Sequence, residues 1–350
     1  MNKTQGAIGN VIRTPDLVAM AMGYSRSRVL CAAARLGVAD AFAGGERSLQ
    51  ELADACQAAP DSLYRLLRAL AVIGITAEVA PGRFVLTPFG EPLRKNVPNS
   101  VWPAVVFWAD LLADSWSYLT DCIRTGQTSF QIMESAGVES RWSKDPEASG
   151  IFRAVMGTAP AENYMPIVQN FDFTNHKVVA DLGGGGGALL AAVLMSHSHL
   201  QGMLVDRSES IQAAAPRFAA NGLESRCRLL AADLSESVPP GADVHLLKHV
   251  LHGYRDEKAI QILRNCRAAL PPNGRLLVIE FVLPAIVSQP DPALEARLMS
   301  DINMLAVTGG KERSVAQWKE LLGAVDFTIE RVQPVPEMDV SIIEAIRNAQ

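Results

Sequence analysis

The sequence contains no window of 18 uninterrupted apolar residues, so we expect no membrane-spanning helix in its 350 residues. The stretch 1–17 lacks the apolar core of a secretory signal peptide, and the expected location is therefore cytoplasmic. No internal repeat and no low-complexity tract is present. The apolar fraction of 49% and the charged fraction of 20% are those of a folded chain with full hydrophobic cores.

Cysteine is scarce, and positive charge is not in excess. The five cysteines are an odd number and no two stand at CxxC spacing, which predicts reduced thiols in hydrophobic cores. Apart from the site residues described below, no group of His, Cys and Asp residues has the spacing of metal ligands, so we expect no bound metal. The net charge of −5 argues against a nucleic-acid partner.

The chain is long enough for two domains, and the pattern of its apolar residues changes near residue 175. Residues 15 to about 170 read almost entirely as helix, with apolar residues at helical spacing. From Lys177 onward, apolar runs alternate with helical segments. This predicts a doubly wound α/β domain with a parallel sheet and helices on both faces. We therefore place a helical domain at 1–170 and an α/β domain at 171–350.

Residues 48–90 have a distinct pattern within the helical half. Ser48 and Glu51 form a capping box at the start of one short helix, and Asp61 begins a second helix. Two short strands about a Pro-Gly turn follow. Two helices and a two-stranded wing together make a winged-helix pattern.

A run of five glycines, Gly183–Gly187, joins the first strand of the α/β domain to the next helix. Glycines let the backbone turn sharply and approach a ligand, and the helix N-terminus points at that ligand. With Ala188 the run fits the dinucleotide pattern G-x-G-x-x-A, and with Asp181 it fits D-x-G-x-G-x-G, the first motif of class I methyltransferases. Both interpretations expect an acidic residue at the end of the second strand, and Asp206 supplies it.

Two further acidic residues favour the methyltransferase interpretation. Asp181, just before Gly183, is suited to holding the cationic methionine end of S-adenosylmethionine through bound water. Asp233 closes the third strand, where an adenine amino group would lie. Within the loop, Gly183 and Gly185 are expected to contact the cofactor.

A histidine and two glutamates follow later strands. His252 lies just past the fourth strand, Glu280 near the end of the fifth, and Glu312 in a loop before a helix. Ligands of an open α/β sheet sit outside the carboxyl ends of its strands, so the three residues can meet at one edge. Glu280 follows four apolar residues, which makes it a poorly solvated carboxylate that needs a partner such as an imidazole. For Glu312, in a Lys-Glu-Arg stretch, a solvated surface position is the alternative.

With these residues in place, the chain resembles the small-molecule O-methyltransferases, which include plant caffeate and flavonoid enzymes and bacterial antibiotic and pigment enzymes. The resemblance covers nearly the whole length. The family's catalytic histidine falls on His252, and its two supporting acids fall on Glu280 and Glu312, at intervals of 28 and then 32 residues. Its cofactor contacts fall on Gly183, Asp206, Asp233, Leu234 and Lys248.

The resemblance implies a Rossmann-like class I methyltransferase domain preceded by a mostly helical, winged-helix-like dimerisation domain, and hence a homodimer. It implies S-adenosylmethionine as cofactor, S-adenosylhomocysteine as product, and a phenolic or enolic hydroxyl of a secondary metabolite as acceptor. His252 would act as general base. The family usually follows this histidine with Asp-Trp, whereas this chain has Gly253-Tyr254, which puts the shape of the acceptor pocket in doubt.

The expected acceptor pocket combines large and polar side chains that lie far apart in the sequence: Trp116, Phe152, Met156, His249, Asn303 and Met304. His249 reads as a pocket-wall or cofactor-side residue, with a purely structural role as an equal alternative. His245, inside the strand, reads as structural.

Three alternatives stay open. A relative that keeps the cofactor could perform C- or N-methylation or non-methylating chemistry. The glycine loop also fits an NAD-dependent oxidoreductase. The winged-helix pattern fits a DNA-binding regulator, although residues 48–90 hold three arginines and four acidic residues, a net charge of −1, where a phosphate-binding surface should be basic.

Overall fold

The structure of the protein is a computed structural model, and it describes residues 14–42, 44–138, 145–157 and 159–348. The chain forms two compact units, each built from two segments. They comprise Met1–Ser117 with Ser140–Val155, and Tyr118–Glu139 with Met156–Gln350.

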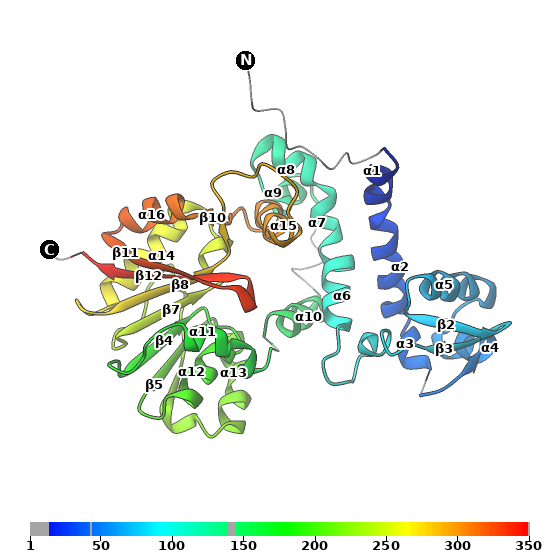
Figure 1. Cartoon of the computed structure of the whole chain (residues 1–350), viewed down its shortest axis with the longest axis horizontal. Coiled ribbons are helices and arrows are strands. Elements are labelled where there is room, and N and C mark those ends of the chain that lie inside the picture. Colours follow the sequence, from blue (N-terminus) through cyan, green and yellow to red (C-terminus); the bar gives the residue numbers. More distant parts are fainter. Residues whose placement is uncertain (1–13, 43, 139–144, 158, 349–350) are drawn as a thin grey trace, which may run out of the picture. The chain divides into compact units, whose positions relative to one another are not determined.

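The first unit is mostly helical, as the sequence predicts (Figure 1). Its helices are α1 (Thr14–Ala21), α2 (Gly23–Arg35), α3 (Val38–Ala41), α4 (Leu49–Cys56), α5 (Pro60–Val72), α6 (Trp102–Val106), α7 (Ala113–Ser117) and, up to Val155, α10 (Pro146–Gly157). A short π-helix, Phe107–Leu111, lies between α6 and α7.

A small antiparallel sheet accompanies α4 and α5. Its strands are β1 (Arg47–Ser48), β2 (Thr76–Ala80) and β3 (Arg83–Leu86), in the order β1-β3-β2. Ser48 caps α4 in the predicted capping box with Glu51. The buried face of α5 carries Leu63, Leu67 and Leu70 at helical spacing. These are the two helices and the two-stranded hairpin expected between residues 48 and 90, with β1 as an additional strand.

The second unit contains a seven-stranded sheet with helices on both faces (Figure 1). Its strands are β4 (Val178–Leu182), β5 (Gln201–Asp206), β6 (Cys227–Ala231), β7 (Val244–Lys248), β8 (Arg275–Glu280), β11 (Phe327–Val335) and β12 (Val340–Arg347). Its helices are α8 (Leu119–Thr125), α9 (Ser129–Ser135), α11 (Met165–Gln169), α12 (Ala188–Ser196), α13 (Ser208–Ala220), α14 (Asp256–Ala269), α15 (Pro292–Val307) and α16 (Val315–Gly323).

The strand order β11-β12-β8-β7-β4-β5-β6 corrects the expectation of a parallel sheet. Strands β4 to β8 are parallel, but β12 runs antiparallel to β8, and β11 antiparallel to β12. The reason is the connection between β11 and β12, residues 336–339. So short a link closes a hairpin and is too short for the crossover that a parallel pair requires.

Each face of the sheet has its own hydrophobic core. One core joins α11, α12 and α13 to the sheet, and the other joins α14 and α16. The segment 118–139, which the sequence places in the helical domain, groups with the second unit because α8 and α9 pack against α15. Among the described residues, no helix combines the length and the apolarity needed to cross a bilayer.

Candidate active site

The glycine run forms the turn between β4 and α12, as predicted. Gly183 has φ +73°, and a Cβ atom there would lie 2.8 Å from a methyl group of Val250. Gly185 has φ +54°, and a Cβ atom there would meet nothing within 4 Å. Left-handed backbone of this kind favours glycine. The turn therefore needs glycine for its conformation, and at Gly185 it faces open space that a ligand can fill.

Asp206 and Asp181 stand on either side of this turn. Asp206 ends β5, and one of its oxygens accepts a hydrogen bond of 2.8 Å from the N–H of Gly185. Asp181 is buried near the end of β4, and its Oδ2 has no hydrogen-bond partner among the described residues. Burial raises the pKa of Asp181 to about 7. A buried carboxyl with one unpartnered oxygen beside the glycine turn fits a cationic group of a ligand.

The other predicted cofactor contacts follow the next strands. Asp233 lies just beyond β6, is exposed, and accepts hydrogen bonds from the backbone N–H and the hydroxyl of Ser235. Leu234 beside it is buried. Lys248 ends β7, and its Nζ lies 5.2 Å from the ring centre of Tyr164. Burial lowers the pKa of Lys248, against the opposing charges of Asp181 and Glu280. Tyr164 was not predicted, because a lone tyrosine in a helical segment carries no motif.

His252 lies between two buried carboxylates. It sits on a single 3-10 turn, Leu251–Gly253, and its Nδ1 is 2.8 Å from Oε1 of Glu312 and 3.6 Å from Oε2 of Glu280. Burial works to lower the pKa of His252, but the two carboxylates outweigh it, so that the pKa lies above its usual range. The structure thus brings the three predicted catalytic residues together, and Glu312 is buried and not on the solvated surface.

Glu280 organises the backbone around this histidine. Its Oε1 accepts hydrogen bonds of 3.0, 3.0 and 3.3 Å from the N–H groups of Val250, Leu251 and His252. Although burial works to raise the pKa of Glu280, interactions with His252 and His249 hold it below its usual range. An ionised carboxylate therefore fixes the turn that carries His252.

Glu312 is held in turn by groups that no sequence pattern indicated. The hydroxyl of Ser300 donates to its Oε1 at 2.8 Å, and Oδ1 of Asp301 accepts from its backbone N–H at 2.8 Å. The buried guanidinium of Arg313 donates to the carbonyls of Leu251 and Tyr254, both at 3.1 Å. The loop before α16 is thereby tied to both α15 and the turn of His252.

His249 also belongs to this cluster. Its Nδ1 is 3.2 Å from Oε2 of Glu280, and its ring stacks on that of His252 with centroids 5.2 Å apart. Burial lowers the pKa of His249. Ligand atoms of His249, His252 and Glu280 lie within 4.8 Å of one another, close enough to hold a metal ion. The absence of metal expected from the sequence stays a prediction.

The remaining acceptor-pocket residues fall into both units. Asn303 is buried on α15, and Met304 beside it is partly buried. Met156 is 55% exposed near the end of α10. Trp116 on α7 and Phe152 on α10 belong to the first unit. Their roles at the acceptor stay predictions.

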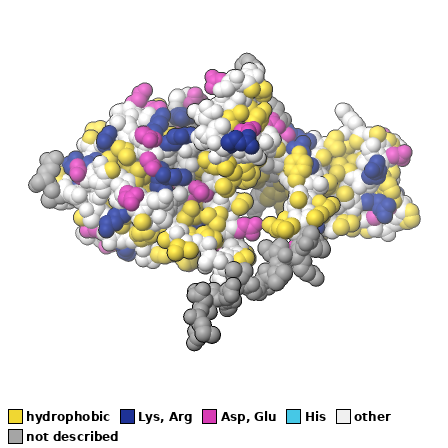
Figure 2. Space-filling view, turned by 90° about the horizontal axis from the view of Figure 1, so that it is seen from above, with side chains coloured by type: hydrophobic (Ala, Val, Ile, Leu, Met, Phe, Trp, Pro, Cys, Tyr) yellow, Lys and Arg dark blue, Asp and Glu magenta, His cyan; other side chains and the backbone are white. Residues whose placement is uncertain are grey.

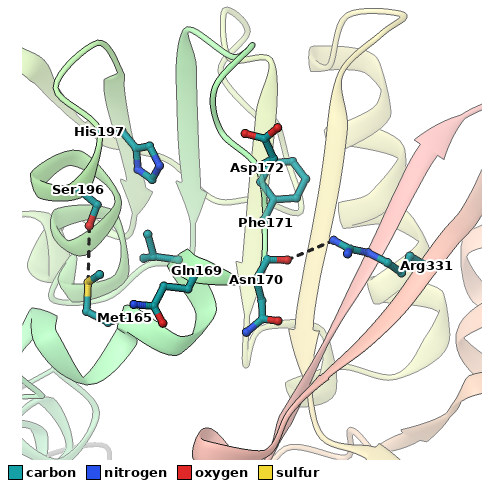
Figure 3. A pocket seen from close by; sticks show the side chains of 9 residues that line it. Met165, Gln169, Asn170, Phe171, Asp172, Ser196, His197 and Arg331 are labelled. Carbon is teal, nitrogen blue, oxygen red and sulfur yellow. Dashed lines mark hydrogen bonds between the residues drawn. The ribbon is translucent and has the colours of Figure 1, made fainter.

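A separate hollow of about 560 Å³ lies at the far end of α12 (Figure 3). Its wall includes Ser196, at the end of α12 opposite the glycine turn, and Arg331, which donates to the carbonyl of Asn170 at 3.1 Å. Since the five parallel strands end on the glycine side of the sheet, this hollow is distinct from the site of Asp206 and His252.

Two family models match the chain. One describes an O-methyltransferase domain and covers residues 116–328, and the other describes an O-methyltransferase dimerisation domain and covers residues 18–95.

Individual relatives extend over almost the whole length. The chain is 35% identical to a phenazine O-methyltransferase of Lysobacter antibioticus, over 96% of this chain and 97% of that protein. It is 32% identical to the 8-amino-8-demethylriboflavin N,N-dimethyltransferase of Streptomyces davaonensis, over 89% of each. Its fold is similar to the crystal structure of an O-methyltransferase from neocarzinostatin biosynthesis in complex with S-adenosylmethionine and 2-hydroxy-5-methyl naphthoic acid, with a TM-score of 0.78, 32% identity, and coverage of 93% of this chain and 96% of that one.

Proposed function

This chain belongs to the O-methyltransferase family, and on that premise we propose that it methylates a phenolic or enolic hydroxyl of a small secondary metabolite. It is an S-adenosylmethionine-dependent methyltransferase of the secondary-metabolite type. The family model and the phenazine O-methyltransferase relative favour oxygen as the methylated atom. A hydroxyl gives up a proton during methylation, and the imidazole of His252, anchored by Glu312 at 2.8 Å, is the proposed group that receives it.

The residues around the glycine turn fit the cofactor. Open space at Gly185 leaves room for it, and Asp206 at the end of β5 suits its ribose hydroxyls. The unpartnered oxygen of Asp181 suits its ammonium group. Asp233, Leu234 and Lys248 complete the proposed set. When bound, S-adenosylmethionine supplies an electrophilic methyl group. The chain itself must align the acceptor and take up the proton that the acceptor hydroxyl loses.

His252 is the proposed general base. Because its Nδ1 faces Glu312, its Nε2 is the nitrogen left to take the hydroxyl proton. Complete proton transfer from a phenol of pKa about 10 to an imidazole of pKa about 6.5 costs roughly 5 kcal/mol. This cost is too large for a resting ion pair but modest within a reaction barrier. Glu280 and Glu312 lower this cost of proton transfer, because they raise the pKa of His252 and stabilise the imidazolium as it forms.

N-methylation is the second candidate, and the relationship to an N,N-dimethyltransferase supports it. An aromatic amine also loses a proton on methylation, so the same base would serve. Incubation with S-adenosylmethionine carrying a labelled methyl group, first with hydroxyaryl and aminoaryl acceptors and then with a metabolite extract, would separate the two. Mass spectrometry should place the label on oxygen, and labelling of nitrogen alone would contradict the proposal.

The base assignment has its own test. We expect His252→Ala to lower turnover by about 10²–10⁴-fold, the usual contribution of general-base catalysis. Affinity for S-adenosylhomocysteine should stay near wild type, because the glycine turn and Asp206 are untouched. Turnover should be compared per folded, cofactor-binding enzyme, with His245→Asn as the control for a buried strand histidine. A His252 variant as active as wild type at pH 7 would remove the base from the mechanism.

A homodimer is the proposed assembly. The match of residues 18–95 to a dimerisation domain supports it, and so do the exposed apolar side chains of α1 and the start of α2. Cytoplasmic location and the lack of a nucleic-acid partner stay predictions.

A further inference from the structure

His249 occupies a backbone conformation that a histidine rarely adopts. It directly follows β7, has φ +51°, and its N–H donates to the carbonyl of Ile279 at 3.1 Å. A non-glycine residue in this region is strained and persists only where its surroundings hold it there. Here they hold its side chain at the edge of the sheet where the cofactor turn and His252 also lie.

The bond to Glu280 settles which nitrogen of His249 carries the proton. The Glu280 carboxylate accepts three backbone N–H groups on Oε1, and Nδ1 of His249 lies 3.2 Å from Oε2. An ionised carboxylate can only accept, so Nδ1 is the donor. Because burial lowers the pKa of His249, its neutral form has the proton on Nδ1 and a bare Nε2.

His252 repeats this arrangement with Glu312. Both imidazoles therefore turn Nδ1 toward a buried carboxylate and Nε2 away from it. The two rings are inclined by only 28° at a centroid distance of 5.2 Å. No hydrogen bond from a described residue reaches either Nε2, and the side chain of His249 is 27% exposed. The two stacked imidazoles thus each keep an Nε2 that no described residue occupies, although proton abstraction needs only one.

Resting on the proposed function, we propose that Nε2 of His249 accepts a hydrogen bond from a second polar group of the substrate. This group is a hydroxyl or amino group on the ring carbon adjacent to the one that bears the methylated oxygen. The acceptor class is then the vicinal dihydroxy- or aminohydroxy-arene. An acceptor without the second donor would bury Nε2 of His249 with no partner, which is costly. A methyl ether at that position would also be rejected, because it has no proton to donate.

Three small probes test this preference. We compare kcat/KM for 2,3-dihydroxynaphthalene and 2-naphthol, with 3-methoxy-2-naphthol as a probe that fills the space without a donor. Wild type should favour the diol by about 10-fold or more, since a site built for a hydrogen bond discriminates against an analogue that lacks it. His249→Phe should bring the ratio near unity, and His249→Gln, whose amide oxygen can accept, should restore part of it.

Binding measured by calorimetry in the presence of S-adenosylhomocysteine separates the possible failures. Equal binding of diol and naphthol by wild type, a ratio that survives in His249→Phe, or no binding of any probe would overturn the inference. So would a His249→Phe protein that loses affinity for S-adenosylhomocysteine and both acceptors alike, because His249 would then face the cofactor. Methylation of 3-amino-2-naphthol on nitrogen alone would sink the proposed function, while the preference between probes stays readable.

Discussion

At the scale of single residues, Asp181 shows how burial controls a charge. Its folded pKa of about 7 lies well above the value of about 4 in an unfolded chain. Between about pH 4 and pH 7 the native protein therefore keeps a proton that the unfolded chain releases. The contribution of Asp181 to the stability of the protein without cofactor is therefore greatest below this window and falls as pH rises through it.

We expect Asp181→Asn to abolish this dependence, because the amide has no proton to lose. The free energy of unfolding of the variant should equal that of wild type below about pH 4. Its advantage over wild type should grow between about pH 4 and pH 7 and be fully present above about pH 7. The variant should also bind S-adenosylmethionine more weakly, since it lacks the anion that pairs with the ammonium group. Urea unfolding across a pH series, with calorimetry for the cofactor, measures both. The exposed Asp54→Asn on α4 is the control, and an unchanged pH profile in Asp181→Asn would contradict the burial argument.

Residue chemistry was predictable where a motif fixes it. Spacing and strand ends identified His252, Glu280 and the glycine turn, because parallel strands bring their carboxyl ends to one edge. The support of Glu312 by Ser300 and Asp301 was not predictable, since it depends on how a loop folds back between α15 and α16. No periodicity in the sequence carries that information.

At the scale of elements, Arg313 fixes the 3-10 turn that carries His252. Its side chain is only 1% exposed, and besides the two carbonyls it donates to Asp256 at 2.8 Å. The loop that contains Gly310 packs directly against this turn. A Cβ atom at Gly310 would lie 1.9 Å from the carbonyl oxygen of His252, so there is no room for a side chain. The turn is thus held by the fork of a guanidinium, which the single ammonium of lysine does not reproduce.

We expect Arg313→Lys to cost about 2–3 kcal/mol of stability, because buried carbonyls lose charge-assisted partners. Turnover should fall more than affinity for S-adenosylhomocysteine, since the variant disturbs the base and leaves the glycine turn intact. Urea midpoints and turnover per folded enzyme give the two quantities. The exposed Arg264→Lys on α14 serves as the matched control. Equal losses in both variants would show that Arg313 has no special role.

The direction of β12 shows a limit of pattern reading at this scale. Its apolar stretch has the pattern of a buried strand. The apolar pattern is the same for parallel and antiparallel buried strands, so this pattern alone did not reveal that β12 runs antiparallel to β8. The short link 336–339 is the signal that distinguishes them.

At the scale of the whole molecule, apolar surface points to assembly. Hydrophobic side chains reach the surface at several places (Figure 2). In α1 and the start of α2, several large ones are more than half exposed. They are Leu17, Val18, Met20, Met22 and Tyr24. Such a concentration in one helical segment is typical of a surface that a partner covers.

We expect the protein to be a dimer at micromolar concentration and Met20→Asp to shift it toward monomer, because a buried unpaired charge in an apolar interface is costly. Light scattering over a dilution series measures the shift. Val315→Asp, on exposed surface of α16 in the second unit, should leave the dimer intact. A wild-type monomer, or a Met20→Asp dimer as tight as wild type, would place the contact elsewhere.

The position of β12 between β8 and β11 also bears on synthesis. On the ribosome, β8 is made well before β12, yet Glu280 at its end pairs with Ser341 of β12. Until α15, α16 and β11 have been made and the hairpin closes, β8, whose four central residues are apolar, has one edge of unpaired backbone groups. An open edge of this kind is a template for pairing with another chain. The nascent protein is therefore exposed to misassembly at this edge, beside the carboxylate that later fixes the turn of His252.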